Sequence, residues 1–373
     1  MKRYILPAMI VAGALLSLTA CNNSSSSAGS APSSASTPTA LTTGNPSSAV
    51  TLQESGSSLL FPYLQELVQP VKQKYPNISL APAAGGSGKG ISDAINGTVQ
   101  MGGSDAYLSP GQLQQNQGLM NIPVAISAQA VNYNLPGVTG LKLSGDVLAQ
   151  IYQGKITKWN APAIASLNPG VKLPATTIVP VRRVESSGDT FLFTSYLSAT
   201  NSAWQNGPGM GTTVTWPAVA GELTASGNPG MVQTCQATPG CIAYVGISAE
   251  QSAQQAHLGE AQLQNKDGKF VELSKTTINA AVQTGATNIP ANLAQSLINE
   301  PGATSYPIVN YEYLVVKQQQ SSADTAEAIR TFLAWTMDPT GGNQAQFLDK
   351  EGFVALPDPV RQAASSSVAK ITG

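Results

Sequence analysis

Three short turns rich in glycine and serine each lead into a stretch whose apolar residues recur at helical spacing. The turns cover residues 54–58, 85–90 and 182–190. The apolar stripes that follow them are Leu60, Leu64, Leu67, Val68 and Val71; Ile91, Ala94, Ile95 and Val99; and Phe193, Tyr196 and Leu197. An apolar run at 177–181 predicts a strand before the third turn. The pattern therefore predicts three helices that begin directly after such turns.

The start of a helix is a natural seat for an anion, because several backbone N–H groups there lack partners and carry a partial positive charge. Glycine lets the backbone approach a ligand closely, and serine adds a hydroxyl donor. Serine is also a common plain N-cap, so a single turn of this kind indicates little. The interpretation depends on the three turns occurring together, with Arg183 in one of them and Asp105 near another.

Two other readings of these turns fit the sequence poorly. A nucleotide-binding P-loop needs a glycine five residues before the final glycine-lysine pair and a hydroxyl after it. Around Lys89 the chain has Ala83 and Gly90 at those positions. A serine hydrolase of the G-x-S-x-G type is not indicated, since that motif is missing and His257, the single histidine, has no evident partner. We assign His257 no role.

The N-terminus has the order of a secretory signal, with Lys2 and Arg3 before an apolar run at 4–18 that is too short to span a bilayer comfortably. The run closes on Cys21 and resembles a bacterial lipobox, so we expect residues 1–21 to be a lipoprotein signal with Cys21 acylated. A plain cleaved signal with an incidental cysteine is the alternative. Residues 22–48 are nearly all small or polar, which predicts a flexible tether at a membrane surface.

Charge and cysteine content narrow the remaining choices. The chain has 19 basic and 20 acidic residues, and only 10% of its residues are charged, so no nucleic acid partner is indicated and any anion must be bound by local groups. Cys235 and Cys241 are predicted to pair as a disulfide in an oxidising compartment. A two-cysteine metal site is a weaker alternative, because neither histidine nor a carboxylate cluster lies nearby. We predict no metal and no cofactor.

Beyond the turns, further segments resemble the phosphate-binding proteins (PstS family) of bacterial phosphate-specific ABC transporters. These segments are residues 103–109, 151–159, 168–170 with 173–174, and 215–217. The resemblance covers most of the chain after the tether. It implies an α/β, two-lobed periplasmic-binding-protein fold of type II, with the ligand in a cleft between the lobes and no catalysis.

The resemblance also implies specific roles. Eight positions match phosphate ligands of the family: Ser58, Leu59, Ser87, Asp105, Arg183, Ser187, Gly188 and Asp189. Asp105 matches the buried carboxylate that accepts a proton from phosphate, and Arg183 matches the guanidinium paired with the anion and with that carboxylate. Glu185 is expected to orient Arg183. The family often has threonine at the position of Asp189 and aspartate at that of Glu185, so this chain departs from the pattern at both.

Selectivity is expected to come from Asp105. Phosphate near neutral pH still carries a proton that a desolvated carboxylate can accept, whereas sulfate carries none and is repelled. An unmatched group in a dry cleft costs about 1–3 kcal/mol, or roughly tenfold or more in affinity. Arsenate has the same shape and similar protonation, so we expect it to be rejected poorly.

A chain of this size is expected to form two domains. We predict one lobe from residues 49–126 and 306–373 and the other from residues 127–305. The expected partners are inorganic phosphate, the permease subunits of an ABC transporter and a membrane through the lipid anchor. We expect a monomer in the periplasm or at the cell surface. The alternative functions are an extracytoplasmic phosphatase and a receptor for another oxyanion such as sulfate or molybdate.

Overall fold

The computed structural model describes residues 41–373. The predicted signal segment, Cys21 as the predicted acylation site, and the predicted tether as far as residue 40 lie outside the described residues. Within residues 41–373, every helix is too short or too polar to pass through a bilayer.

The end of the predicted tether is part of the folded unit. Gly44 exchanges two hydrogen bonds with the hydroxyl of Thr331, with its N–H donating at 2.9 Å and its carbonyl accepting at 2.8 Å. The Ser47 hydroxyl donates to Asp324 at 2.8 Å. The boundary predicted at residue 48 is therefore wrong, because these backbone and hydroxyl groups find partners on one helix, which the small and polar composition of the segment does not reveal.

Ten strands form one mixed sheet within residues 41–373, and three short strands form a second sheet. The main order is β2-β1-β3-β13-β4-β8-β6-β7. The strands of the main sheet are β1 (Val50–Gly56), β2 (Ile78–Ala81), β3 (Met101–Ser104), β4 (Leu119–Tyr133), β6 (Val179–Arg183), β7 (Leu223–Ala225), β8 (Cys241–Gly246), β9 (Gly259–Glu260), β12 (Leu297–Ile298) and β13 (Ile308–Lys317). The second sheet contains β5 (Lys142–Leu143), β10 (Gln262–Gln264) and β11 (Phe270–Val271).

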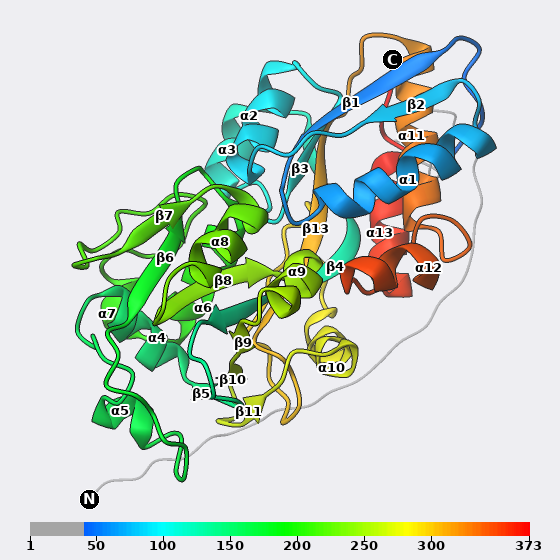
Figure 1. The fold of residues 1–373 in the computed structure, drawn as a ribbon. Coiled ribbons are helices and arrows are strands. Elements are labelled where there is room, and N and C mark those ends of the chain that lie inside the picture. Colours follow the sequence, from blue (N-terminus) through cyan, green and yellow to red (C-terminus); the bar gives the residue numbers. More distant parts are fainter. Residues whose placement is uncertain (1–40) are drawn as a thin grey trace, which may run out of the picture. The chain divides into compact units, whose positions relative to one another are not determined.

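Helices pack around both sets of strands (Figure 1). In the first third of the chain and at its C-terminal end they are α1 (Phe61–Lys74), α2 (Ser87–Asn96), α3 (Pro110–Gln115), α11 (Ala323–Met337), α12 (Ala345–Leu348), η2 (Asp349–Glu351) and α13 (Asp358–Val368). In the intervening part they are α4 (Gly145–Tyr152), α5 (Pro162–Ala165), α6 (Gly188–Thr200), α7 (Ser202–Gln205), α8 (Gly227–Gln236), η1 (Ile247–Ala249), α9 (Glu250–Gln255) and α10 (Lys275–Gly285).

Two groups of parallel strands flank a central antiparallel pair. β1 runs parallel to both β2 and β3, and β6 runs parallel to both β7 and β8. Between the groups, β4 pairs with β13 along residues 119–128 and with β8 along residues 129–133. The long central strands are buried over nearly their whole length, as their almost continuous apolar sequences require. The antiparallel pair of β4 and β13 thus links the two groups, because β13 pairs with β3 and β4 pairs with β8.

This topology decides where a ligand site can form. In open α/β sheets, ligands bind beyond the carboxyl ends of parallel strands. β1 ends at Gly56 before α1, β3 ends at Ser104, and β6 ends at Arg183 before α6. Of the three turns singled out in the sequence, the first (54–58) therefore lies at the carboxyl end of β1 and the third (182–190) at that of β6. The second (85–90) leads into α2. α2 begins at Ser87 and α6 at Gly188, directly after glycine and serine residues.

Candidate functional site

The structure brings all eight predicted ligand residues into one buried region. Ser58 and Leu59 precede α1, Ser87 opens α2, and Asp105 follows β3. Arg183 ends β6, Ser187 is the N-cap of α6, and Gly188 and Asp189 form its first turn. Each of these residues is buried, with Ser58 the most exposed at 9%. Two separate groups of strands therefore contribute side chains to a single cluster.

Asp105 is held from two sides by serine residues. The hydroxyl of Ser57 donates a short hydrogen bond to Oδ1 of Asp105. The backbone N–H of Asp105 donates to the Oγ of Ser87 at 3.1 Å. Burial, followed by the negative charge of Asp189, raises the pKa of Asp105 from 3.8 to about 7. This carboxyl group therefore binds a proton far more readily than an exposed aspartate.

Arg183 is clamped by carboxylates on either side. Its Nη1 lies 2.6 Å from Oδ2 of Asp189, and its Nε donates to Oε1 of Glu185 at 2.7 Å. Its Nη2 contacts the same Glu185 oxygen and also donates to the Oγ of Ser58 at 3.1 Å. Glu185 thus orients the guanidinium group, although its side chain is longer than that of the aspartate which the family often has at this position. The backbone N–H of Gly227 donates to Glu185 at 2.8 Å and fixes it in turn.

The predicted pairing of Arg183 with Asp105 is wrong in this structure. Arg183 forms its ion pairs with Glu185 and Asp189. Both partners follow Arg183 within six residues on the turn that leads into α6. Their carboxylates contact Nε, Nη1 and Nη2 of the guanidinium group. The charges of Asp189 and Glu185 hold the pKa of Arg183 above its ordinary value although burial opposes this.

Asp189 is almost saturated with donors. Besides Arg183, it accepts from Nδ2 of Asn228 at 2.9 Å and from Nε2 of Gln129 at 3.0 Å. Burial raises its pKa, and the charge of Arg183 opposes the rise. At Glu185, burial is opposed by the hydrogen bond and the charge of Arg183 and by backbone N–H groups, and together these hold the pKa of Glu185 below its ordinary value. The cluster therefore contains carboxyl groups with different proton affinities.

Four contributors were missed in the sequence: Ser57, Gln129, Asn228 and Glu312. Glu312, on β13, is fully buried and accepts a hydrogen bond from Ser127 Oγ at 2.5 Å. A sequence signal exists for two of them. Gln129 and Glu312 interrupt long apolar strands, and a polar residue in a strand that is buried on both faces needs a partner. Ser57 lies in the first of the glycine- and serine-rich turns and Asn228 in the first turn of α8, and neither carries such a signal.

Gly188 lets the two halves of the cluster meet. A Cβ at this position would lie 2.3 Å from Oδ2 of Asp105 and 2.4 Å from Oγ of Ser87. Because those atoms belong to a short, buried side chain and to the first residue of a helix, they have little room to move. The backbone of α6 can approach Asp105 only without a side chain at residue 188.

Cys235 and Cys241 form a disulfide that joins the end of α8 to the start of β8, with the two Cα atoms 5.3 Å apart. Neither cysteine belongs to the buried cluster. Within residues 41–373, the His, Cys, Asp and Glu side chains form no group of three that is arranged to hold a metal ion.

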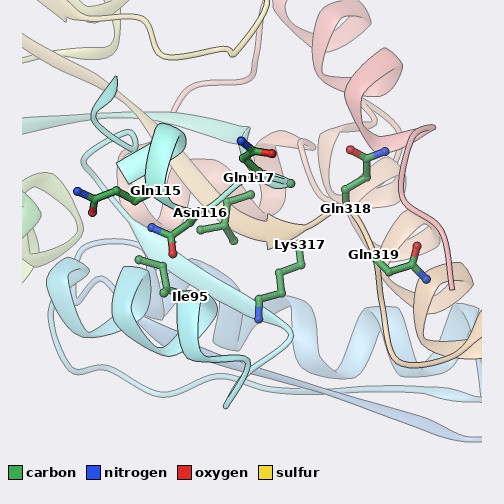
Figure 2. Close-up of a pocket in the computed structure, with 9 residues that line it drawn as sticks. Ile95, Gln115, Asn116, Gln117, Lys317, Gln318 and Gln319 are labelled. Carbon is green, nitrogen blue, oxygen red and sulfur yellow. The ribbon is translucent and has the colours of Figure 1, made fainter. Parts of the chain in front are cut away.

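A separate surface pocket lies where α2, the turn after α3 and the end of β13 meet (Figure 2). It is lined by neutral side chains and a single lysine, Lys317. None of the residues of the buried cluster lines it. The pocket therefore plays no part in the site described above.

Comparison with known proteins fits this geometry. Residues 28–340 match the model of the PBP superfamily domain. A phosphate-binding protein PstS of Methanocaldococcus jannaschii is 32% identical over 86% of this chain and 86% of its own length. The chain belongs to the PstS family. Other members are the PstS of Pasteurella multocida, 36% identical over 74% of this chain and 78% of its own, and PstS3 of Mycobacterium bovis, 32% identical over 96% of each.

Solved structures share the fold of this PstS family member. A high affinity periplasmic phosphate-binding protein determined with phosphate at pH 8.5 matches with a TM-score of 0.68 and 21% identity, over 84% of this chain and 92% of its own. The phosphate-binding protein of Stenotrophomonas maltophilia matches with a TM-score of 0.61 and 23% identity, over 85% and 93%. The fold is accordingly the mixed α/β fold of periplasmic binding proteins.

Proposed function

We propose that this protein captures inorganic phosphate outside the cytoplasm and delivers it to the permease of an ABC transporter. The observation that carries the proposal is the buried cluster in which Asp105, Arg183 and the N-terminus of α6 meet. A guanidinium group and the positive end of a helix attract an anion, and a desolvated carboxylate admits one that still carries a hydrogen. The names of the relatives support phosphate as that anion.

In this proposal the eight residues named above form the phosphate shell. Ser58, Ser87 and Ser187 supply hydroxyl groups, and Leu59 and Gly188 supply backbone N–H groups. Arg183 supplies charge through a planar fork, while Asp105 accepts the proton of phosphate and repels sulfate. Asp189 is the second carboxylate near the ligand, and its partners Arg183, Asn228 and Gln129 hold it in place.

The proposed lobes are residues 49–126 with 306–373, and residues 127–305. Contacts between these parts enclose the cluster, since Gly88 N–H donates to the carbonyl of Ser186 at 3.1 Å and Arg183 reaches Ser58. Release of phosphate requires these contacts to break, and β4 and β13 are the strands that join the two parts. We propose a hinge motion about these strands.

The proposed location is the periplasm or the cell surface, with acylated Cys21 anchoring a monomer to the membrane. Removal of the lipid signal is predicted to leave a protein that binds phosphate equally well, because residue 21 precedes the folded unit. Metabolic labelling with a fatty acid tests the anchor. Labelling that persists after Cys21→Ser excludes that residue as the acceptor.

The function itself is tested by calorimetric titration of the signal-free protein with phosphate, sulfate and arsenate. A phosphate receptor binds phosphate and arsenate, excludes sulfate and does not turn over phosphate esters. Hydrolysis of esters supports the alternative of a phosphatase, and preference for sulfate or molybdate supports the alternative of another oxyanion receptor.

A further inference from the structure

A carboxyl group outside the predicted site lies directly behind Asp105. In the antiparallel pair of β3 and β13, Tyr313 is opposite Ser104 and Leu314 is opposite Gly103. Continued by one residue, this register places Glu312 opposite Asp105. The carboxyl groups of these two residues are within hydrogen-bonding reach of each other. Glu312 is 0% exposed.

An irregularity in the sheet supports a functional placement of this side chain. The register between β13 and β4 shifts between Glu312 and Tyr313. Such bulges re-aim side chains and are frequent beside functional sites. Here the shift falls at the residue that faces Asp105.

The hydrogen bonds of Glu312 are incomplete for an ionised group. Its Oε1 accepts from Ser127 Oγ at 2.5 Å and from Asn310 Nδ2 at 3.4 Å. Among residues 41–373, no donor reaches its Oε2. A buried carboxylate oxygen without a donor is costly, whereas the O–H of a neutral carboxyl group can donate to Asp105.

The charges around the cluster lead to the same conclusion. Arg183 already pairs with Asp189 and Glu185. Burial and, after it, the negative charges of Asp105 and Asp189 oppose the ionisation of Glu312, so its pKa lies well above the ordinary value. A site with Asp105, Asp189 and Glu312 all ionised would repel an incoming anion.

We propose that Glu312 is a positioning residue for anion recognition: its carboxyl group is neutral in the folded protein and donates its hydrogen to Asp105. This donation keeps Asp105 in the ionised form that accepts the hydrogen of phosphate. The inference rests on the proposed function for the meaning of Asp105, but the state of Glu312 is a property of the ligand-free protein.

Infrared spectroscopy of the ligand-free protein at pH 7 tests the state of Glu312 directly. A neutral carboxyl group gives a carbonyl band distinct from those of carboxylates. We expect this band to lose intensity in Glu312→Gln. Glu54→Gln is the matched control, because burial raises the pKa of Glu54 to about 8 and it has its own partners, the N–H groups of Gly103 and Ala83. That variant should keep the Glu312 component.

Phosphate titration of two variants tests the donation. Glutamine can accept from Ser127 and donate to Asp105 as a neutral glutamic acid does, so Glu312→Gln is expected to bind within about threefold of the unaltered protein. Glu312→Met fills a similar volume but has no donor. This variant is expected to bind phosphate at least about tenfold more weakly, because Asp105 loses its hydrogen-bond partner. Thermal unfolding followed by circular dichroism checks that each variant is folded.

The proposal is overturned if the infrared band is the same in Glu312→Gln and the unaltered protein, if methionine binds phosphate as tightly as glutamic acid, or if glutamine binds as weakly as methionine. Failure of the unaltered protein to bind phosphate overturns the proposed function instead. The infrared result on the free protein still decides the state of Glu312 in that case.

Discussion

Gly188 packs directly against Asp105, so that a Cβ on the glycine would lie 2.3 Å from the carboxylate Oδ2. This contact joins the start of α6 to the segment after β3. The buried cluster exists in this form only while α6 can approach so closely. We therefore expect substitutions at either residue to weaken ligand binding more than they destabilise the rest of the fold.

Gly188→Ala is expected to weaken phosphate binding by about tenfold or more, because the added methyl group forces Asp105 or the helix start to move. Calorimetric titration measures the change. Gly111→Ala is the matched control, since the nearest atom to a Cβ there is 4.0 Å away and the residue also lies in a helix. Equal affinities for the two variants would contradict the close approach.

Arg183→Lys is expected to weaken phosphate binding by about 10- to 100-fold, since lysine cannot span Asp189, Glu185 and a ligand with one planar group. The neighbouring residue offers a matched control. Arg182 pairs with Glu222 at 2.9 Å near the surface, so Arg182→Lys should bind within about twofold of the unaltered protein. The account is contradicted if both substitutions have the same effect.

The sequence predicts the parts of this site that depend on local structure. Ser87, Ser187 and Gly188 stand where a helix begins, and the glycine and serine signals that mark such starts lie within a few residues. The partners of Asp189 and Asp105 come from distant parts of the chain. Gln129 and Glu312 reach them only because β4 and β13 pass behind the cluster, which is a property of the sheet order. The pairing of Arg183 with Asp189 rather than Asp105 likewise depends on the path of a turn.

The ligand-free protein is expected to lose stability as pH rises from 5 to 8. Burial raises the pKa of Glu54 from 4.5 to about 8, and it also raises the pKa values of the neighbouring carboxyl groups Asp105 and Glu312, which together hold a proton. The folded state therefore binds more protons than the unfolded chain across this interval. The free energy of unfolding should therefore fall with rising pH, by about 3 kcal/mol for each carboxyl group that keeps its proton to about pH 7 or 8. Chemical unfolding in phosphate-free buffers measures it.

Glu54→Gln and Asp105→Asn each remove one of these proton-binding groups and should flatten the profile. Asp358→Asn is a suitable control, because that carboxylate lies at the exposed start of α13. A profile that is flat over the same interval would show that these carboxyl groups ionise as readily in the folded protein as in the unfolded chain.

Phosphate affinity is expected to fall as pH rises from 6 to 9 if Asp189 as well as Asp105 faces the ligand. Phosphate loses a proton over this interval. It then has fewer hydrogens to donate to the two buried carboxyl groups. Asp189→Asn should make the profile shallower, because asparagine needs no proton from the ligand. A flat profile for the unaltered protein would remove Asp189 from contact with phosphate.

The central claim is that a buried carboxylate recognises phosphate by the hydrogen that the anion still carries. The most direct measurement is the ratio of phosphate to sulfate affinity in Asp105→Asn, compared with the unaltered protein by calorimetry at pH 7. Because asparagine can donate to sulfate and no longer repels it, the ratio is expected to fall by about tenfold or more. An unchanged ratio in a folded variant would contradict the claim.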